Sequence, residues 1–192
     1  SGIIYGVRLL EALKSQPVES HLVMTKAAEM TLGYETDLSA AEVHGLADVN
    51  HPIADIGAAI ASGSFRTDGM IVAPCSIRSL SEIATGVTTT LLTRAADVVL
   101  KERRRLVLMV RETPLHLGHL RSLVALAEMG ATIAPAVPAM YPRPQSVDAI
   151  VEHSVGRLLD LFDLEAGLVR RWREEDAPSP PKLRAVKPAK GA

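Results

Sequence analysis

The stretch Arg-Leu-Val-Leu-Met-Val-Arg-Glu-Thr-Pro-Leu (105–115) passes from an apolar run directly into a charged pair. The apolar run predicts a buried strand at 105–110. Arg111 and Glu112 follow at once, so they fall where an α/β sheet presents its strand ends to a ligand crevice. A fixed cation beside a carboxylate suits a phosphorylated substrate and a reaction that needs proton transfer.

Short apolar runs alternate with longer helical stretches along the chain, which indicates β-α-β units around a parallel sheet. The pattern predicts strands at 20–25, 69–74, 105–110 and 131–136, and a short fifth strand near 45–49. It predicts helices at 3–14, 26–32, 40–44, 53–62, 79–101, 115–129 and 146–162. Ser79 and Glu82 have the spacing of a capping box, and Gly130 is suited to end the helix 115–129. The expected fold class is α/β, with a doubly wound parallel sheet.

Ser1 and Gly2 stand directly before the first predicted helix. In a doubly wound sheet, the loop after the first strand and the next helix N-terminus cradle a phosphate. Ser1 and Gly2 are therefore expected to be the end of such a loop. We also expect the first strand to be truncated here and further residues to precede Ser1 in the natural chain.

A second polar loop, Pro-Ala-Met-Tyr-Pro-Arg-Pro-Gln-Ser (138–146), follows the next predicted strand. It places Tyr141 and Arg143 after a strand end, as the first motif does for Arg111 and Glu112. Its prolines restrict the backbone, so the loop is expected to be stiff.

Length and composition set bounds on the whole chain. The 192 residues fit one domain, and a net charge of −1 gives no nucleic-acid footprint. The single cysteine excludes an internal disulfide and fits a reducing, cytoplasmic compartment. No apolar run approaches the roughly 20 residues of a membrane span. The prolines and basic residues after Trp172 predict a domain at 1–172 and a flexible basic tail at 173–192.

Taken together, the motifs resemble those of the UbiX family, the flavin prenyltransferases, over residues 1 to about 172. The resemblance rests on the order and spacing of Ser-Gly-Ile-Ile-Tyr-Gly-Val-Arg-Leu-Leu (1–10), Ser-Gly-Ser-Phe (62–65), Pro-Cys-Ser (74–76), Leu-Thr-Arg-Ala-Ala-Asp-Val-Val-Leu-Lys-Glu-Arg-Arg (92–104), Arg-Glu-Thr-Pro-Leu (111–115) and Tyr-Pro-Arg-Pro-Gln-Ser (141–146). Of the family's Gly-Ala-Ser-Gly phosphate loop, Ser-Gly is present.

The resemblance implies a flavodoxin-like, three-layer fold and a transfer of a dimethylallyl group from dimethylallyl phosphate to reduced FMN. Bonds would form at flavin N5 and C6. The product would be the prenylated FMN cofactor of UbiD-type decarboxylases, which act on aromatic acids and in ubiquinone synthesis. It also implies a homododecamer with sites at subunit interfaces and no metal.

The site residues fall into three expected sets. The FMN set lies at strand ends and helix starts: Ser1, Gly2, Thr25, Ser76, Ile77, Arg78, Ser79 and Arg111. The resemblance assigns the donor phosphate to Tyr141 and Arg157, with Lys101 nearby and Arg94 two turns away on one helix. Fixed charges aimed at the leaving phosphate would stabilise the transition state. The catalytic set is Glu112 as proton carrier, with Ser1, Lys101 and Trp172, whose ring would face the allyl cation.

Each assignment has a simpler alternative. Ser76 and Ser79 also suit helix capping, and Glu112 also suits an ion pair with Arg111. Lys101 and Arg94 could line a solvated helix face, and Trp172 could be a packing anchor. Cys75 has no histidine placed by spacing to activate it. His116 and His119 have no third metal ligand by spacing, so no metal site is expected.

Two other functions fit the same fold class. An FMN-dependent decarboxylase of peptidyl or pantothenoyl cysteine would be expected to show a catalytic histidine and a different substrate loop. A non-catalytic, FMN-binding accessory subunit of an aromatic-acid decarboxylase would not need Lys101, Tyr141 and Arg157 together.

Overall fold

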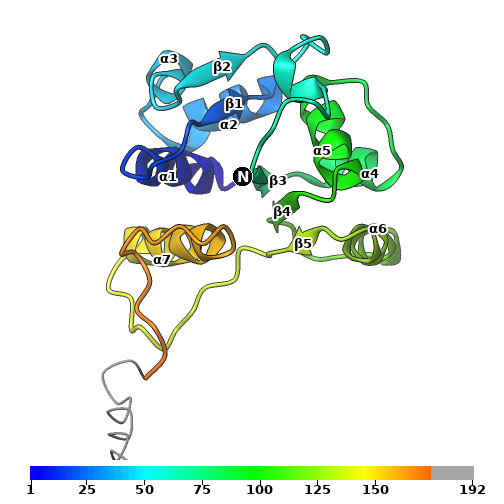
Figure 1. The fold of residues 1–192 in the computed structure, drawn as a ribbon. Helices are drawn as coiled ribbons and strands as arrows, with labels where there is room; N and C mark the ends of the chain where they lie inside the picture. Colours follow the sequence, from blue (N-terminus) through cyan, green and yellow to red (C-terminus); the bar gives the residue numbers. More distant parts are fainter. Residues whose placement is uncertain (174–192) are drawn as a thin grey trace, which may run out of the picture.

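The computed structural model describes residues 1–173, so the predicted tail lies outside the described residues except for Arg173. Figure 1 shows the arrangement of its helices and strands. In chain order the elements are α1 (Ile3–Leu13), β1 (His21–Val23), α2 (Lys26–Glu35), α3 (Ala40–His44), β2 (Val49–His51), the short 3-10 helix η1 (Ala59–Ala61), β3 (Gly69–Cys75), α4 (Ile77–Ala84), α5 (Leu91–Lys101), β4 (Arg105–Val110), α6 (Leu117–Glu128), β5 (Thr132–Ile133) and α7 (Val147–Asp160).

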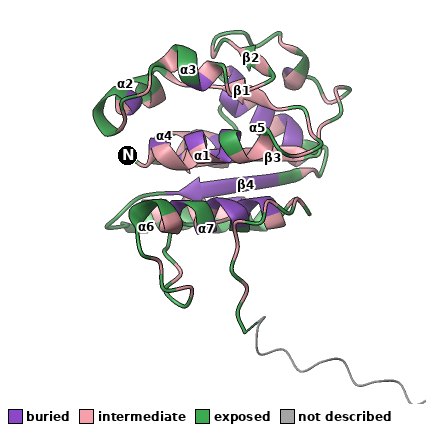
Figure 2. Ribbon diagram, turned by 90° about the vertical axis from the view of Figure 1, so that its left-hand side faces the viewer, coloured by how far each residue is buried: buried purple, intermediate pink, exposed green. Residues whose placement is uncertain are grey.

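All the strand pairs are parallel, which confirms the α/β class. Strands β3, β4 and β5 form one sheet in that order, and β1 pairs with β2 in another. Leu106 to Val110 of β4 are all buried (Figure 2). A strand without a polar side is typical of a parallel sheet covered on both faces.

Helices cover both faces of the β3-β4-β5 sheet and give the three-layer arrangement visible in Figure 1. Val72, Leu106 and Leu108 point to one face and pack with residues of α4, α5 and α6. Val107 and Met109 point to the other face, where α1 and α7 lie. A further cluster joins α1 to α2 and α3 through Val7, Leu32 and Val43. The layers place the starts of α1 and α4 near the carboxyl ends of the strands.

One long predicted helix is wrong. Residues 79–101 form two helices, α4 and α5, because Gly86 has φ 72°, a left-handed conformation that interrupts a helix. The predicted Ser79–Glu82 capping box is also wrong. Ser76 caps α4 instead and accepts a hydrogen bond from the Ser79 amide at 3.1 Å.

Other helix and strand boundaries also differ from the predicted ones. Only Ala59–Ala61 of the predicted helix 53–62 is helical, because the Asp55 carboxylate accepts the Gly57 amide at 3.2 Å and forms a turn. Strand β5 is shorter than predicted, although the amides of Ala134 and Ala136 continue the pairing with β4 at 2.9 and 3.0 Å. The strand predicted near 45–49 is β2, which starts at Val49, after the residues that end α3. Gly130, with φ 99°, follows α6 as predicted.

Candidate functional site

The carboxyl ends of β3 and β4 bring two predicted residues next to each other. Cys75 of β3 is in register with Val110 of β4. The next residues, Ser76 and Arg111, therefore leave the sheet from neighbouring strands. The Ser76 hydroxyl caps α4 and donates to the Ser79 hydroxyl at 3.1 Å. Capping is thus shown, and both hydroxyls remain at the strand-end edge where a ligand would bind.

The start of α1 lies against Arg111. Arg111 Nε donates to the Ser1 carbonyl oxygen at 3.4 Å. Gly2 precedes α1 with φ 91°, and a Cβ atom there would lie 3.3 Å from the Tyr5 ring and 3.7 Å from Arg111 Cγ. A glycine is therefore required both by the backbone conformation and by the close approach of its neighbours. The structure brings Ser1, Gly2 and Arg111 together, as predicted.

Glu35 also belongs to this site, and sequence reasoning missed it. Its carboxylate accepts the amides of Gly2 at 2.7 Å and Ile3 at 3.0 Å. Burial opposes ionisation, but hydrogen bonds from Ser1, Gly2 and Ile3 outweigh it and lower the pKa of Glu35. These residues are 33 and 32 positions away in the chain, so no spacing pattern could have revealed the contact.

The α1 N-terminus fits an anionic ligand such as the FMN phosphate. Its first amides already bind a carboxylate, and the helix dipole favours a negative charge at that end. Because Gly2 has no side chain, the backbone at this position is accessible to a ligand. The hydroxyls of Ser76 and Ser79 add neutral donors at the neighbouring helix start. Together these groups match the chemistry of a phosphate and a polar ligand edge.

Three further residues of the predicted FMN set lie at helix starts. Thr25 caps α2 by accepting the Ala28 amide at 3.1 Å. Ile77 is the first residue of α4. Arg78 is turned to Glu82, with Nε 2.8 Å from its carboxylate, and its side chain is exposed.

Tyr141, predicted to bind the donor, and Trp172, predicted to be catalytic, meet in a second cluster. Their rings pack edge to face, with centroids 5.2 Å apart. The Tyr141 hydroxyl donates to the Arg170 carbonyl at 2.8 Å and lies 3.1 Å from His153 Nε2. His153 is buried on α7, one turn before Arg157. Sequence reasoning missed His153, because its helical pattern gives only a core position.

Lys101 and Arg94 lie elsewhere in the chain. Lys101 ends α5 and its Nζ lies 2.5 Å from Glu102 Oε1. It precedes β4, whereas Arg111 follows it, and a strand of six residues spans about 20 Å. Arg94 donates to the Ala61 carbonyl at 3.2 Å and pairs with Asp97 at 2.9 Å. Within residues 1–173, the contacts of Lys101 and Arg94 are thus with Glu102, Ala61 and Asp97, and neither side chain is hydrogen-bonded to the strand-end group or to Tyr141.

Glu112 is exposed beside Arg111, but it forms a different contact from the alternative that the sequence allowed. Its carboxylate accepts the Thr113 amide at 3.0 Å, while Arg111 is turned to Ser1. Within the described residues no ion pair joins Arg111 and Glu112. The Glu112 carboxylate is therefore exposed, with one oxygen bound by the Thr113 amide.

Cys75 is buried at the end of β3, and burial raises the pKa of its thiol to about 12. A thiol with such a pKa is almost entirely protonated at neutral pH and is a poor nucleophile. We expect Ellman's reagent at pH 8 to leave the native protein unlabelled and to label one thiol per chain after unfolding. Rapid labelling of the native protein would contradict this placement.

The rings of His116 and His119 lie against each other, with centroids 3.5 Å apart and planes tilted by 31°. His116 Nδ1 accepts the Gly118 amide at 3.0 Å, so this ring caps α6. Among residues 1–173 no group of three potential ligands is arranged to hold a metal ion. In the same part of the chain, none of the helices has the length and apolar character needed to cross a bilayer.

Comparisons with known proteins agree with this geometry. The family model Flavoprotein matches residues 1–159. The chain is 58% identical over 176 residues to the flavin prenyltransferase UbiX of Escherichia coli K12, covering 90% of this chain and 93% of that protein. It is 56% identical over 172 residues to UbiX of Thauera aromatica, covering 90% and 89%.

Two solved structures are similar over most of their length. AnUbiX in complex with FMN and dimethylallyl pyrophosphate superposes with a TM-score of 0.88 and 50% identity, covering 90% of this chain and 92% of that one. A dodecameric, FMN-dependent UbiX-like decarboxylase from E. coli O157:H7 gives 0.87 and 53%, covering 89% and 93%. The chain therefore belongs to the Flavoprotein family and, within it, to the UbiX flavin prenyltransferases.

Proposed function

We propose that this chain transfers a dimethylallyl group from dimethylallyl phosphate to N5 and C6 of reduced FMN. The observation that carries the proposal is the strand-end group, in which the start of α1, Arg111 and the Ser76 hydroxyl converge on one edge of the sheet. The similar AnUbiX was crystallised with FMN and a dimethylallyl ester, and the curated relatives are flavin prenyltransferases. Residues 1–172 form the prenyltransferase domain.

Reduced FMN is a substrate here, and it supplies the nucleophilic ring atoms. The hydroxyls of Ser1, Ser76 and Ser79 hold its phosphate and polar edge, together with the Gly2 amide, which the phosphate takes over from Glu35. Thr25 follows β1, and Ile77 and Arg78 follow β3. Arg111 adds a fixed positive charge. These residues orient the acceptor while Glu112 takes the proton released from C6. Glu35, with its lowered pKa, is a second carboxylate at this site.

The donor half of the site consists of Tyr141, Arg157, Lys101 and Arg94, with Trp172 as an aromatic wall. Arginine and lysine side chains stabilise the departing phosphate dianion more than the bound ester, which lowers the barrier to carbon–oxygen cleavage. The Trp172 ring stabilises positive charge as it grows on the allyl carbon. No metal is required for this step.

We propose further that the flavin half and the donor half meet between subunits of a homododecamer, as the dodecameric E. coli relative suggests. One chain leaves apolar side chains on its surface that a neighbouring subunit would cover. Leu117 and Val124 on α6 are 59% and 57% exposed, and Tyr34 on α2 is 84% exposed. Exposed apolar groups of this kind mark interaction surfaces.

We propose the cytoplasm as the compartment, because a single buried cysteine fits reducing conditions. The product is expected to pass to a UbiD-type decarboxylase. The proposed activity is tested by incubating the protein anaerobically with reduced FMN and dimethylallyl phosphate and measuring the mass of the flavin. Addition of one five-carbon unit is expected. Flavin bound but unchanged would favour an accessory subunit, and release of carbon dioxide from a cysteine-containing substrate would favour a cysteine decarboxylase.

Gly2→Ala is expected to weaken FMN binding at least about tenfold, because a side chain there is strained at φ 91° and its Cβ atom would lie only 3.3 Å from the Tyr5 ring. Gly33→Ala is a matched control, since a Cβ atom at Gly33 meets nothing within 4 Å. Flavin fluorescence titration measures both variants. Equal affinity for FMN in the two variants would remove the α1 N-terminus from the flavin site.

A further inference from the structure

Residues 164–172, which follow α7, run back along that helix and end at Trp172. We call this segment the strap. Its apolar residues Leu164, Ala166 and Leu168 pack on a cluster formed by Leu9 of α1 and Val151, Val155 and Leu159 of α7. Gly156 of α7 lies directly beneath it, and a Cβ atom there would be 2.6 Å from Val169 Cγ2 and 2.9 Å from Leu168 Cβ. The strap is therefore seated on a position that only glycine leaves open.

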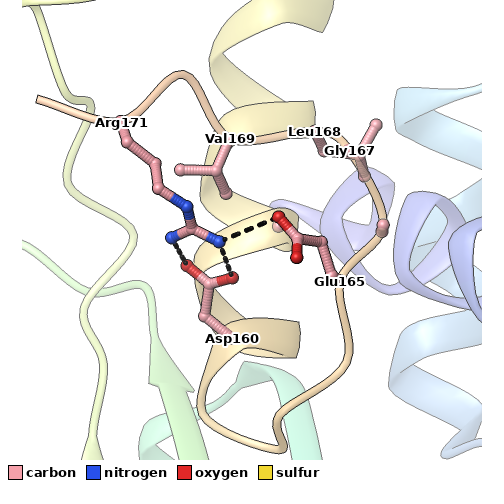
Figure 3. A pocket seen from close by; sticks show the side chains of 8 residues that line it. Asp160, Glu165, Gly167, Leu168, Val169 and Arg171 are labelled. Atoms are coloured by element: carbon pink, nitrogen blue, oxygen red, sulfur yellow. Dashed lines mark hydrogen bonds and ion pairs between the residues drawn. The ribbon is translucent and has the colours of Figure 1, made fainter. Parts of the chain in front are cut away.

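Asp160, the last residue of α7, fastens the strap by its charge. Its two carboxylate oxygens accept NH1 and NH2 of Arg171 at 3.1 and 3.2 Å, a two-point contact shown in Figure 3. Arg171 NH2 also reaches Glu165 Oε1 at 3.3 Å, within the strap itself. Fork-to-fork contacts of this kind fix geometry better than a single ion pair does.

The same carboxylate also holds Arg157, which is assigned to the donor phosphate. Arg157 NH1 donates to Asp160 Oδ2 at 2.6 Å, and the Asp160 side chain is only 16% exposed. A guanidinium has five N–H donors in a fixed plane. With NH1 engaged by Asp160, the opposite edge of Arg157 keeps donors for an incoming phosphate.

The strap also positions Tyr141. The Tyr141 hydroxyl donates its proton to the Arg170 carbonyl oxygen. His153 Nε2 lies 3.1 Å from the Tyr141 hydroxyl oxygen and 3.4 Å from the Arg170 carbonyl oxygen. Both of these atoms are acceptors toward His153, so His153 carries its proton on Nε2. Trp172 then packs edge to face on Tyr141. The strap thus connects Tyr141 and Trp172 to the Asp160 anchor.

We propose that Asp160 is a positioning residue of the donor site, which orients Arg157 and, through Arg171, anchors the strap that carries Trp172 to Tyr141. The inference rests on the proposed prenyl transfer, and it extends that proposal to residues that do not contact the substrate. Hydrogen bonds from Arg171 and Arg157 offset the burial of the Asp160 carboxyl and lower its pKa, so the anchor stays charged at neutral pH.

Asp160→Asn tests the proposal, since it keeps the shape and removes the charge. We expect kcat/KM for dimethylallyl phosphate to fall at least about tenfold, because small displacements of positioning groups have effects of that size. Affinity for FMN should stay within twofold of wild type. Trp172 is the only tryptophan of the chain, so its fluorescence anisotropy reports directly on the strap. Measured on the oligomer without flavin, the anisotropy of Asp160→Asn should be lower than that of wild type.

Two further variants separate positioning from stability. Gly156→Ala retains every charge but lifts the strap, and it should lower both the Trp172 anisotropy and kcat/KM. Asp163→Asn is the matched control: it removes an exposed carboxylate whose partner is Arg105, at 2.7 Å, and it should change neither readout. Wild-type anisotropy in Asp160→Asn, or kcat/KM within twofold of wild type, would overturn the proposal. A wild-type protein that forms no prenylated flavin would refute the proposed function instead, and the anisotropy comparison would still test the anchor.

Discussion

Arg157→Ala is expected to lower kcat/KM for dimethylallyl phosphate about 100-fold, while affinity for FMN stays near wild type. Loss of one preorganised donor aimed at developing charge typically has this effect. Arg157 has the means to act in this way, because its side chain is half-exposed on α7 and one end of its guanidinium is held by Asp160. Steady-state kinetics with saturating reduced FMN and varied donor measures the change.

Two comparisons sharpen this result. Tyr141→Phe removes a hydroxyl but no charge, so it should lower kcat/KM less than Arg157→Ala does. It should also slow formation of the first flavin–prenyl bond. Arg121→Ala removes an exposed arginine of α6 and should leave the kinetics unchanged. If Arg157→Ala retained the wild-type kcat/KM, the donor phosphate would have to bind elsewhere, and the assignment of Tyr141 and Arg157 would be wrong.

Glu112→Gln is expected to stop the reaction after the first flavin–prenyl bond. In ring closure the prenyl double bond gains a proton at one carbon, its other carbon bonds to C6, and C6 then loses its proton to the base. An amide keeps the shape of the side chain without its basicity. Ring closure should slow about 100-fold, within the range reported for loss of a general base. The two products have the same mass, so proton NMR of the extracted flavin is the measurement: the C6 proton persists in the variant and disappears in wild type.

Glu35→Gln is the comparison for this prediction, because Glu35 is the other carboxylate at the strand-end group. Its substitution should mainly disturb the α1 N-terminus and flavin binding. If Glu35→Gln accumulates the singly bonded flavin and Glu112→Gln gives the full product at the wild-type rate, the proton acceptor is Glu35. The assignment of Glu112 would then be wrong.

The sequence predicted the parts of the site that depend on local order along the chain. Apolar runs followed by polar residues located the ends of β3 and β4, and hence Ser76 and Arg111. Ser1 and Gly2 were expected at a helix N-terminus, and the structure places Gly2 there with its positive φ. The helix 79–101 was misjudged because its apolar pattern continues through Gly86, whose conformation decides the break.

Contacts between distant residues were beyond the sequence pattern. Glu35 reaches Gly2, and Asp160 holds Arg171, through the packing of α1, α2, α7 and the strap. Neither carboxylate has a spacing that distinguishes it from an ordinary surface residue. The distance between Lys101 and Arg111 is also a property of the folded chain, since β4 separates them. The resemblance named both residues but gave no position for either.

Prenyl transfer is proposed to take place at a site built from the flavin half of one subunit and the donor half of another. Gly2→Val removes the flavin half, and Arg157→Ala removes the donor half. At low donor concentration, Arg157→Ala alone should form prenylated FMN at about 1% of the wild-type rate, and Gly2→Val alone should also be far slower than wild type. In oligomers assembled from equal amounts of the two, about a quarter of the sites should combine two intact halves, because subunits join by unlike surfaces. We predict prenylated FMN formation at that fraction of the wild-type rate. A rate in the mixed oligomers no higher than that of the two variants alone, with wild-type protein active after the same treatment, would contradict the shared site.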